Sequence, residues 1–275
     1  MRWKNVDVPK FERSEISINY EVSGSGPRVL FFNGSGATLK SASLLISALA
    51  KTCTVLAHDQ RGLGETSIPD GPYTMAQYAH DGAALLDHVG WDTCAIVGIS
   101  FGGMVAQEFA VSYPQRVEKL VLLCTSAGGD AGSSYPLHEL GALPADERAA
   151  RITTLTDTRF TPEWLATHPD DAAMVTMRNE QAAVPKSKET IKGEMLQLGA
   201  RMSHDVCDRL HRVTAPAFVT AGRFDGIAPV ENSEEIVKRL PDATLSLYEG
   251  GHLFTAQDRQ AIVDIRTFLT TGQRP

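Results

Sequence analysis

A serine between glycines is the residue best placed to act as a nucleophile. Ser100 lies in Gly98-Ile99-Ser100-Phe101-Gly102, a G-x-S-x-G segment between an apolar, strand-like run and a helical pattern. This strand–turn–helix context is what a nucleophile elbow requires, because the sharp turn exposes the serine hydroxyl. The N-terminus of the following helix also favours developing negative charge. The alternative is that Ser100 is only the N-cap of that helix.

A serine hydroxyl needs a neighbouring base, and His252 is the histidine best placed to supply one. It follows the last predicted strand, 243–250, so it should lie at the same sheet edge as Ser100. Two glycines directly before it allow the loop to turn the imidazole inward. His58 lies at the end of another predicted strand, and we interpret it as structural.

A carboxylate must orient the imidazole and offset its charge, and Asp225 is the main candidate. Asp225 comes directly after the predicted strand 215–222, and the resulting chain order is serine, aspartate, histidine. The alternative role for Asp225 is a turn aspartate paired with Gly226. A second possible acid, Asp130, lies farther from the end of its strand.

Acyl transfer also requires N–H groups that hold an oxyanion. One is expected from the backbone of Phe101, next to the nucleophile, and the second from the loop 33–36. Within that loop we favour the N–H of Ser35, with Gly36 as the alternative. Asn33 and Gly34 of the same loop are predicted to border the substrate pocket. The competing interpretation of the loop is a plain glycine-rich turn.

Alternating apolar runs and helical patterns predict the scaffold that positions these residues. Strand-like runs include 28–33, 52–59, 92–100 and 117–126, and helical patterns separate most of them. Nearly all-apolar strands alternating with helices indicate an α/β fold with a mostly parallel sheet covered on both faces. Ligands bind at the carboxyl ends of such strands.

The alternation stops over 127–207, where loops and several helical patterns replace the strands. This predicts a core formed by 1–126 and 208–275, with a helical lid (127–207) inserted after the sixth predicted strand. Trp164 and Met177 are expected to border the substrate pocket. Most of the large apolar residues of the lid are expected simply to pack it on the core; they are Phe160, Trp164, Met174, Met177, Met195 and Met202.

Composition excludes several classes of partner and cofactor. The net charge of -7 argues against nucleic acid as the main partner. No apolar run approaches the roughly 18 residues of a membrane helix, and no signal peptide is visible at the N-terminus, so a cytoplasmic protein is expected. Cysteines with zinc-ligand spacing are absent, so no metal is predicted. The four cysteines are predicted to be buried free thiols: Cys53, Cys94, Cys124 and Cys207.

Five segments together resemble the α/β-hydrolase superfamily over essentially the whole chain. The segment 58–67 is similar to the D-x-R-G-x-G-x-S pattern of that superfamily, where its role is structural. One departure is Asn33, which stands where many relatives have histidine before glycine. The five segments are 31–38, 58–67, 97–103, 221–229 and 250–254.

Within that superfamily the chain is most similar to small lidded esterases and to the 3-oxoadipate enol-lactonase group. The resemblance implies a cofactor-independent serine hydrolase, monomeric or homodimeric, that cleaves an ester or lactone of a small, largely apolar substrate. A C–C bond hydrolase would use the same triad and would need a basic pocket residue, for which Arg178 and Arg201 are candidates. A cofactor-free perhydrolase would also share the triad. A ligand receptor that retains the triad is the alternative of another class.

Overall fold

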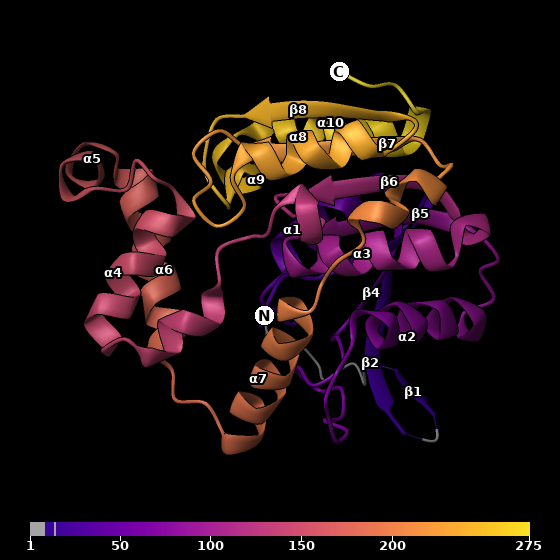
Figure 1. The fold of residues 1–275 in the computed structure, drawn as a ribbon, viewed down its shortest axis with the longest axis horizontal. Helices are drawn as coiled ribbons and strands as arrows, with labels where there is room; N and C mark the ends of the chain where they lie inside the picture. Colours follow the sequence, from indigo (N-terminus) through magenta and orange to yellow (C-terminus); the bar gives the residue numbers. More distant parts are fainter. Residues whose placement is uncertain (1–8, 14) are drawn as a thin grey trace, which may run out of the picture.

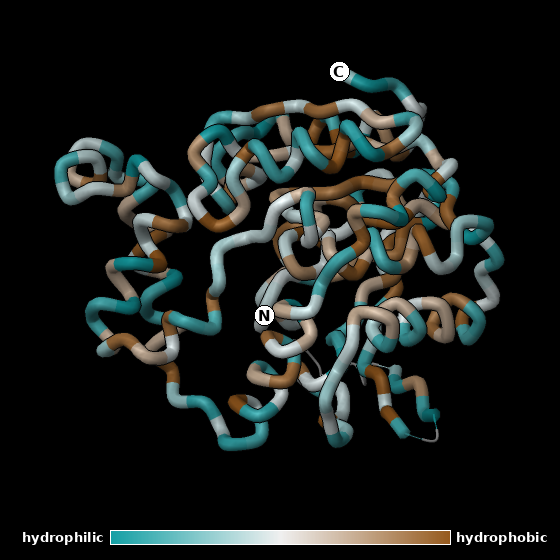
Figure 2. The backbone as a smooth tube through the Cα atoms, in the orientation of Figure 1, coloured by the Kyte–Doolittle hydropathy of each residue, from teal (hydrophilic) through white to brown (hydrophobic). Residues whose placement is uncertain are grey.

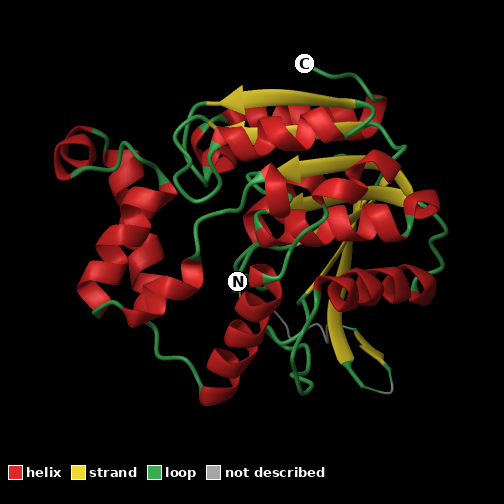
Figure 3. Cartoon of the chain, viewed as in Figure 1, coloured by secondary structure: helices red, strands yellow, loops and turns green. Residues whose placement is uncertain are grey.

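The computed structural model describes residues 9–13 and 15–275. Its centre is one sheet with the strand order β1-β2-β4-β3-β5-β6-β7-β8 (Figures 1 and 3). β1 and β4 both run antiparallel to β2, and all other neighbours are parallel. The strands are β1 (Lys10–Glu12), β2 (Ser17–Gly24), β3 (Arg28–Phe32), β4 (Thr54–His58), β5 (Cys94–Ile99), β6 (Val117–Leu123), β7 (Ala217–Gly222) and β8 (Ala243–Tyr248).

Helices cover both faces of the sheet, as the apolar strands predict. Successive strand residues point to opposite faces, so Leu30 joins one buried cluster and Val29 the other. The first cluster contains side chains of α2, α3 and α8, and the second contains side chains of α1 and α10. The helices are α1 (Ser43–Ala50), α2 (Met75–His88), α3 (Phe101–Ser112), α4 (Ala145–Thr156), α5 (Pro162–Thr167), α6 (Pro169–Ala183), α7 (Lys188–Met202), α8 (Val230–Arg239), α9 (Phe254–Gln257) and α10 (Arg259–Thr271).

The segment 58–67 has the structural role that the resemblance implies. The Asp59 carboxylate accepts hydrogen bonds from the Asn19 side chain and from the backbone N–H groups of Leu39 and Glu65. Arg61 donates two hydrogen bonds, of 2.9 and 2.8 Å, to the buried carboxylate of Asp81 on α2. These contacts fix the loop after β4 against β2, the loop after β3 and α2.

The segment 127–207 contains α4 to α7, as the helical patterns predict. In Figure 1, α4, α5 and α6 lie together at one side of the molecule, away from the sheet, whereas α7 lies closer to the core. The N–H of Gly36, in the loop after β3, donates to the Gln197 side chain of α7 at 2.8 Å. We therefore propose that this insertion is a lid and that α7 is its inner element.

The expected packing of the lid methionines is wrong in part. Phe160 is buried, but Met177, Met195 and Met202 are exposed. In Figure 2 hydrophobic colour is concentrated along the strands and their covering helices, whereas α4 to α6 carry a mixture. The helical periodicity of 127–207 predicts its helices correctly. The faces of these helices that carry Met177, Met195 and Met202, however, are not covered by other parts of the protein.

Two short elements were not expected from the sequence. β1 is only three residues long, and its pairing with β2 is visible only in three dimensions. α9 spans four residues and begins two residues after His252. All four cysteines are buried and free, as predicted. No helix in the described part of the chain is long and apolar enough to cross a membrane.

The turn between β5 and α3 depends on glycine at two positions. A Cβ on Gly98 would lie 2.2 Å from the carbonyl oxygen of Gly102, and a Cβ on Gly102 would lie 2.0 Å from that of Phe32. Real Cβ atoms do not approach backbone atoms so closely. The two glycines therefore let α3 begin directly against the carboxyl ends of β3 and β5.

We expect Gly102→Ala to lower the free energy of unfolding by about 3 kcal/mol or more, because the clash is with backbone and cannot be relieved by rotating a side chain. Gly199→Ala is the matched control. A Cβ at that position of α7 meets nothing within 4 Å, and alanine favours a helix by roughly 1 kcal/mol over glycine. Urea unfolding of both variants measures the difference. Equal stabilities would contradict this account of the turn.

Candidate active site

Ser100 occupies the sharp turn between β5 and α3, where the sequence predicts a nucleophile. Its backbone has φ 55° and ψ -118°, and the left-handed φ is unfavourable for a residue with a side chain. The Ser100 carbonyl accepts a hydrogen bond from the Thr125 hydroxyl at 2.8 Å, which ties the turn to the segment after β6. The residue is only 9% exposed, so its hydroxyl is largely shielded from solvent.

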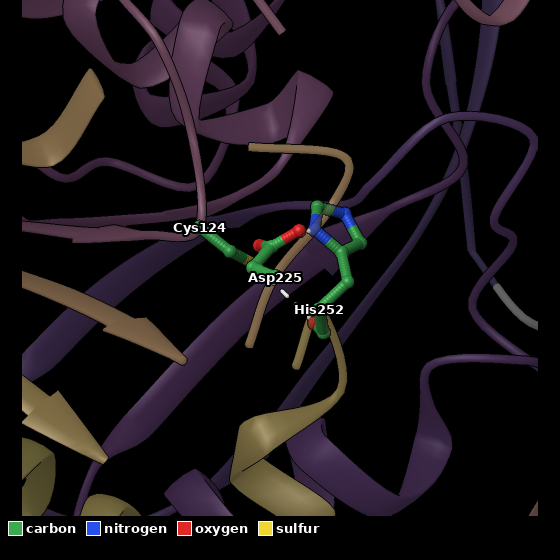
Figure 4. A group of neighbouring side chains, drawn as sticks. All are labelled: Cys124, Asp225 and His252. Carbon is green, nitrogen blue, oxygen red and sulfur yellow. Dashed lines mark hydrogen bonds and ion pairs between the residues drawn. The ribbon is translucent and has the colours of Figure 1, made fainter. Parts of the chain in front are cut away.

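His252 lies between Ser100 and Asp225, although the three residues come from different loops. Its Nε2 is 2.9 Å from the Ser100 Oγ, and its Nδ1 is 2.7 Å from an Asp225 carboxylate oxygen. Figure 4 shows the imidazole and the Asp225 carboxylate directed toward one another. A carboxylate only accepts, so Nδ1 carries the proton and Nε2 is free to accept the serine proton.

Backbone contacts hold both partners of the imidazole–carboxylate pair. The second carboxylate oxygen of Asp225 accepts the N–H groups of Ile227 and Ala228, each at 2.8 Å. The N–H of His252 donates to the carbonyl of Thr156, at the end of α4, at 2.6 Å. The aspartate is therefore fixed by its own loop, and the histidine by contact with the first lid helix.

The ionisation of His252 is set by two opposing effects. Burial disfavours the imidazolium and alone lowers its pKa, but the Asp225 carboxylate raises the pKa by more. The net result is a pKa well above the ordinary histidine value. The imidazole is thus a strong base held against the serine hydroxyl.

Cys124 lies beside this pair and is a contact that sequence reasoning did not assign. Its thiol donates to the carbonyl of His252 at 3.5 Å (Figure 4). Its backbone has a φ of 41°. The Cys124, Asp225 and His252 ligand atoms lie within 4.8 Å of one another. Burial raises the pKa of the Cys124 thiol, so the thiol stays protonated. Because Asp225 and His252 are already paired, we interpret the group as support for the histidine loop.

The loop after β3 approaches Ser100 from the other side. A Cβ on Gly34 would lie 3.7 Å from the Ser100 Cβ, so this glycine allows the loop to pass close to the serine. The N–H of Gly36 is already bonded to Gln197. The N–H groups of Ser35 and Phe101 make no hydrogen bond within the described residues. This favours Ser35 over the alternative, Gly36, as the second oxyanion donor.

The other predicted pocket residues lie elsewhere. Asn33 is completely buried; its side chain faces the His58 carbonyl, and its own carbonyl accepts from Gln60. Trp164 and Met177 border a separate groove of about 760 Å³ between α5, α6 and α9. Neither Ser100 nor His252 borders that groove. Asn33 therefore shapes the loop through its backbone and buried contacts.

The two alternative acid–base residues do not reach the serine. His58 is buried at the end of β4, where burial lowers its pKa to about 4, and it makes no hydrogen bond to Ser100. Asp130 is exposed in a short 3₁₀ turn, Gly129–Ala131. Within the described residues, the carboxylate that contacts His252 is that of Asp225.

Comparisons with known proteins agree with this architecture. A family model described as alpha/beta hydrolase fold matches residues 27–257. The chain belongs to the α/β hydrolase family. The α/β-hydrolase fold expected from the sequence is therefore confirmed.

Three similar proteins are instructive. A poly(3-hydroxyalkanoate) depolymerase of Ectopseudomonas oleovorans is 29% identical, over 86% of this chain and 82% of the relative. A 3-oxoadipate enol-lactonase 2 of Acinetobacter baylyi is 26% identical, over 90% of each chain. The crystal structure of a hydrolase from Pseudomonas aeruginosa PA01 is 26% identical, with a TM-score of 0.77 over 98% of this chain and 100% of that one.

Proposed function

We propose that this protein is a serine hydrolase of carboxylic esters or lactones, with Ser100, His252 and Asp225 as its catalytic triad. The observation that carries the proposal is the continuous hydrogen-bond chain from the Ser100 hydroxyl through His252 to Asp225, at 2.9 and 2.7 Å. Each residue lies at the carboxyl edge of the sheet, where α/β proteins bind ligands. The left-handed backbone of Ser100 is the conformation expected of a nucleophile elbow, which directs the serine hydroxyl away from the strand and helix.

In the first half of the reaction, His252 Nε2 takes the Ser100 proton as the Oγ attacks the substrate carbonyl. The carbonyl oxygen becomes an oxyanion, for which the N–H groups of Phe101 and Ser35 are the proposed donors. The C–O bond then breaks, and the leaving alcohol takes the proton from Nε2. This leaves an acyl group on Ser100 and a neutral imidazole.

In the second half, the same imidazole removes a proton from water as that water attacks the acyl carbon. The Ser100 Oγ leaves and regains its proton from Nε2, and the acid is released. Asp225 stays ionised throughout and stabilises the imidazolium that forms in each half. The chain's own residues supply every proton transfer, so the proposed reaction needs no metal or organic cofactor.

The names of two relatives support the choice of esters and lactones: one is a 3-oxoadipate enol-lactonase and the other is a poly(3-hydroxyalkanoate) depolymerase. We propose turnover of 4-nitrophenyl butyrate and of a simple γ-lactone, followed by nitrophenolate absorbance and by titration of released acid. Hydrolysis of either substrate with a burst of the alcohol product supports the acyl-enzyme route. Failure to hydrolyse both, by a folded protein, would contradict the proposed bond class.

The rate should depend on pH through His252. The neutral imidazole is the active base, and Asp225 raises its pKa, so kcat/KM is expected to rise with pH through a midpoint above the ordinary value of about 6.5. Asp225→Asn removes the effect that raises the pKa and leaves the burial that lowers it. The midpoint of the residual activity should then move to lower pH. A midpoint that does not move would exclude Asp225 as the partner of the base.

A further inference from the structure

A second cluster of buried polar groups lines a cavity outside the triad and is not used by the proposed mechanism. Arg201, near the end of α7, is only 7% exposed. Its Nη2 donates to the carbonyl of Tyr135 at 2.8 Å, and its Nε is buried without a hydrogen-bond partner. Among residues 9–13 and 15–275 no carboxylate pairs with this guanidinium.

A buried cation of this kind is costly unless an anion compensates it. Burial lowers the pKa of Arg201 to about 10, so the side chain still carries its charge at neutral pH. Two other arginines, each paired with a buried carboxylate, show what the compensation ordinarily is. Arg61 pairs with Asp81 at 2.8 Å, and Arg209 pairs with Glu108 at 2.7 Å.

Arg201 borders a cavity of about 250 Å³, together with Ser126, Ser134, His138 and His204. This volume is just below the usual range for small-ligand pockets, roughly 300–1,000 Å³, and therefore suits a small group. The cavity has a built polar wall, because Ser134 and Ser126 bond to each other at 2.9 Å through their hydroxyls.

His204 adds a second unpartnered group to that wall. It is 6% exposed, and burial lowers its pKa to about 4, so the ring is neutral at pH 7. Its Nε2 donates to the carbonyl of Ser126 at 3.2 Å. Its Nδ1 is therefore an acceptor, and it is buried without a partner. The cavity thus combines one uncompensated cation with a neutral acceptor.

Two segments connect the cavity to the nucleophile, although Ser100 and His252 do not themselves border it. Met104, which borders it, stands one turn of α3 after Ser100, a rise of about 5.4–6 Å along the helix. Ser126, which also borders the cavity, follows Thr125, whose hydroxyl bonds to the Ser100 carbonyl at 2.8 Å. A ligand in the cavity can therefore belong to the molecule whose carbonyl meets Ser100.

We propose that this cavity binds a carboxylate of the substrate through Arg201. The proposal rests on the proposed hydrolase function and narrows it: the preferred substrate is an ester or lactone that also bears a free acid, a few atoms from the scissile carbonyl. A guanidinium offers paired N–H donors that match a carboxylate. The neutral His204 beside it accepts a hydroxyl of the same substrate.

The test compares a charged ester with its neutral isostere. Mono-4-nitrophenyl glutarate carries a carboxylate where 4-nitrophenyl pentanoate has a methyl group. The wild type should prefer the charged ester. Arg201→Gln should lower kcat/KM for the charged ester about 10- to 100-fold, mainly through KM, and change that for the neutral ester less than about threefold. Arg201→Lys should retain an intermediate preference.

Arg212→Gln is the matched control, because Arg212 is exposed and its loss removes one positive charge without touching the cavity. It should leave both substrates unaffected. An equal loss on both esters in Arg201→Gln would overturn the proposal, because it would show a purely structural role. A wild type that does not favour the charged ester would also overturn it.

A binding measurement separates this proposal from the hydrolase function itself. Monomethyl glutarate should bind to the Ser100→Ala protein more tightly than neutral dimethyl glutarate, by calorimetry, and Arg201→Lys should reduce that difference. This comparison requires neither turnover nor a correctly folded Arg201→Gln protein. Equal binding of the two esters would overturn the carboxylate site even if the enzyme hydrolyses esters. If Ser100→Ala binds monomethyl glutarate preferentially but the wild type hydrolyses no ester, the carboxylate site is supported and the proposed function is contradicted.

Discussion

Replacing Ser100 with alanine is expected to lower kcat for an ester substrate about 10⁵- to 10⁶-fold, the scale of losing the nucleophile of a triad. Alanine removes the Oγ that lies 2.9 Å from His252 Nε2, and no acyl-enzyme can then form. Steady-state rates with 4-nitrophenyl butyrate measure the effect. The fold should be retained, because the serine side chain makes no other hydrogen bond within the described residues.

Ser112→Ala is the control for this variant. Ser112 lies at the other end of α3, is exposed, and bonds only to Glu108 at 3.1 Å. Its rate should equal that of the wild type. A Ser100→Ala protein with more than a few per cent of wild-type kcat would show that another residue attacks the carbonyl, and the triad assignment would then fail.

Asp225→Asn is expected to lower kcat about 10⁴-fold, the second largest effect, while leaving the protein folded. An asparagine can still accept the N–H groups of Ile227 and Ala228 with its oxygen. Its amide nitrogen then faces His252 Nδ1, and a donor at that position forces the ring proton onto Nε2. In this predominant tautomer the imidazole cannot accept the Ser100 proton, so most of the base function is lost although the ring keeps its position, and the residual activity comes from the minor tautomer with a free Nε2.

The matched control is Asp130→Asn, which tests the alternative acid and should leave kcat unchanged. Asp130 is exposed and does not contact His252. Pre-steady-state measurement of the alcohol burst would show whether acylation is the impaired step. If Asp130→Asn were the slow variant and Asp225→Asn had the wild-type rate, Asp130 and not Asp225 would be the carboxylate that orients the imidazole.

Much of the fold and of the candidate site follows from local sequence patterns. The strand–turn–helix around Ser100 is encoded within a dozen residues, since an apolar run, glycines and a helical period all lie together. Asp225 and His252 each come directly after a buried strand, and parallel strands bring their carboxyl ends to one edge. Topology alone therefore predicts that these loops meet.

The parts that could not be predicted depend on contacts between distant segments. No local sequence pattern around Cys124 predicts that its thiol donates a hydrogen bond to the His252 carbonyl. The sequence offers both Arg201 and Arg178 as basic candidates, and only the fold distinguishes them: Arg201 borders the cavity, whereas Arg178 donates to the Thr156 hydroxyl at the end of α4. The positions of Trp164 and Met177 likewise depend on how α5 and α6 are held, which helical periodicity does not encode.

The central claim is that Ser100 is the nucleophile, and covalent labelling tests it most directly. We would treat the protein with a fluorophosphonate, digest it with trypsin and locate the label by mass spectrometry. Ser100 lies in the peptide 62–116, which contains no internal lysine or arginine. The account predicts one label, on Ser100, with activity lost in proportion to labelling and no label in His252→Ala. A label on another serine, or full activity after Ser100 is labelled, would contradict it.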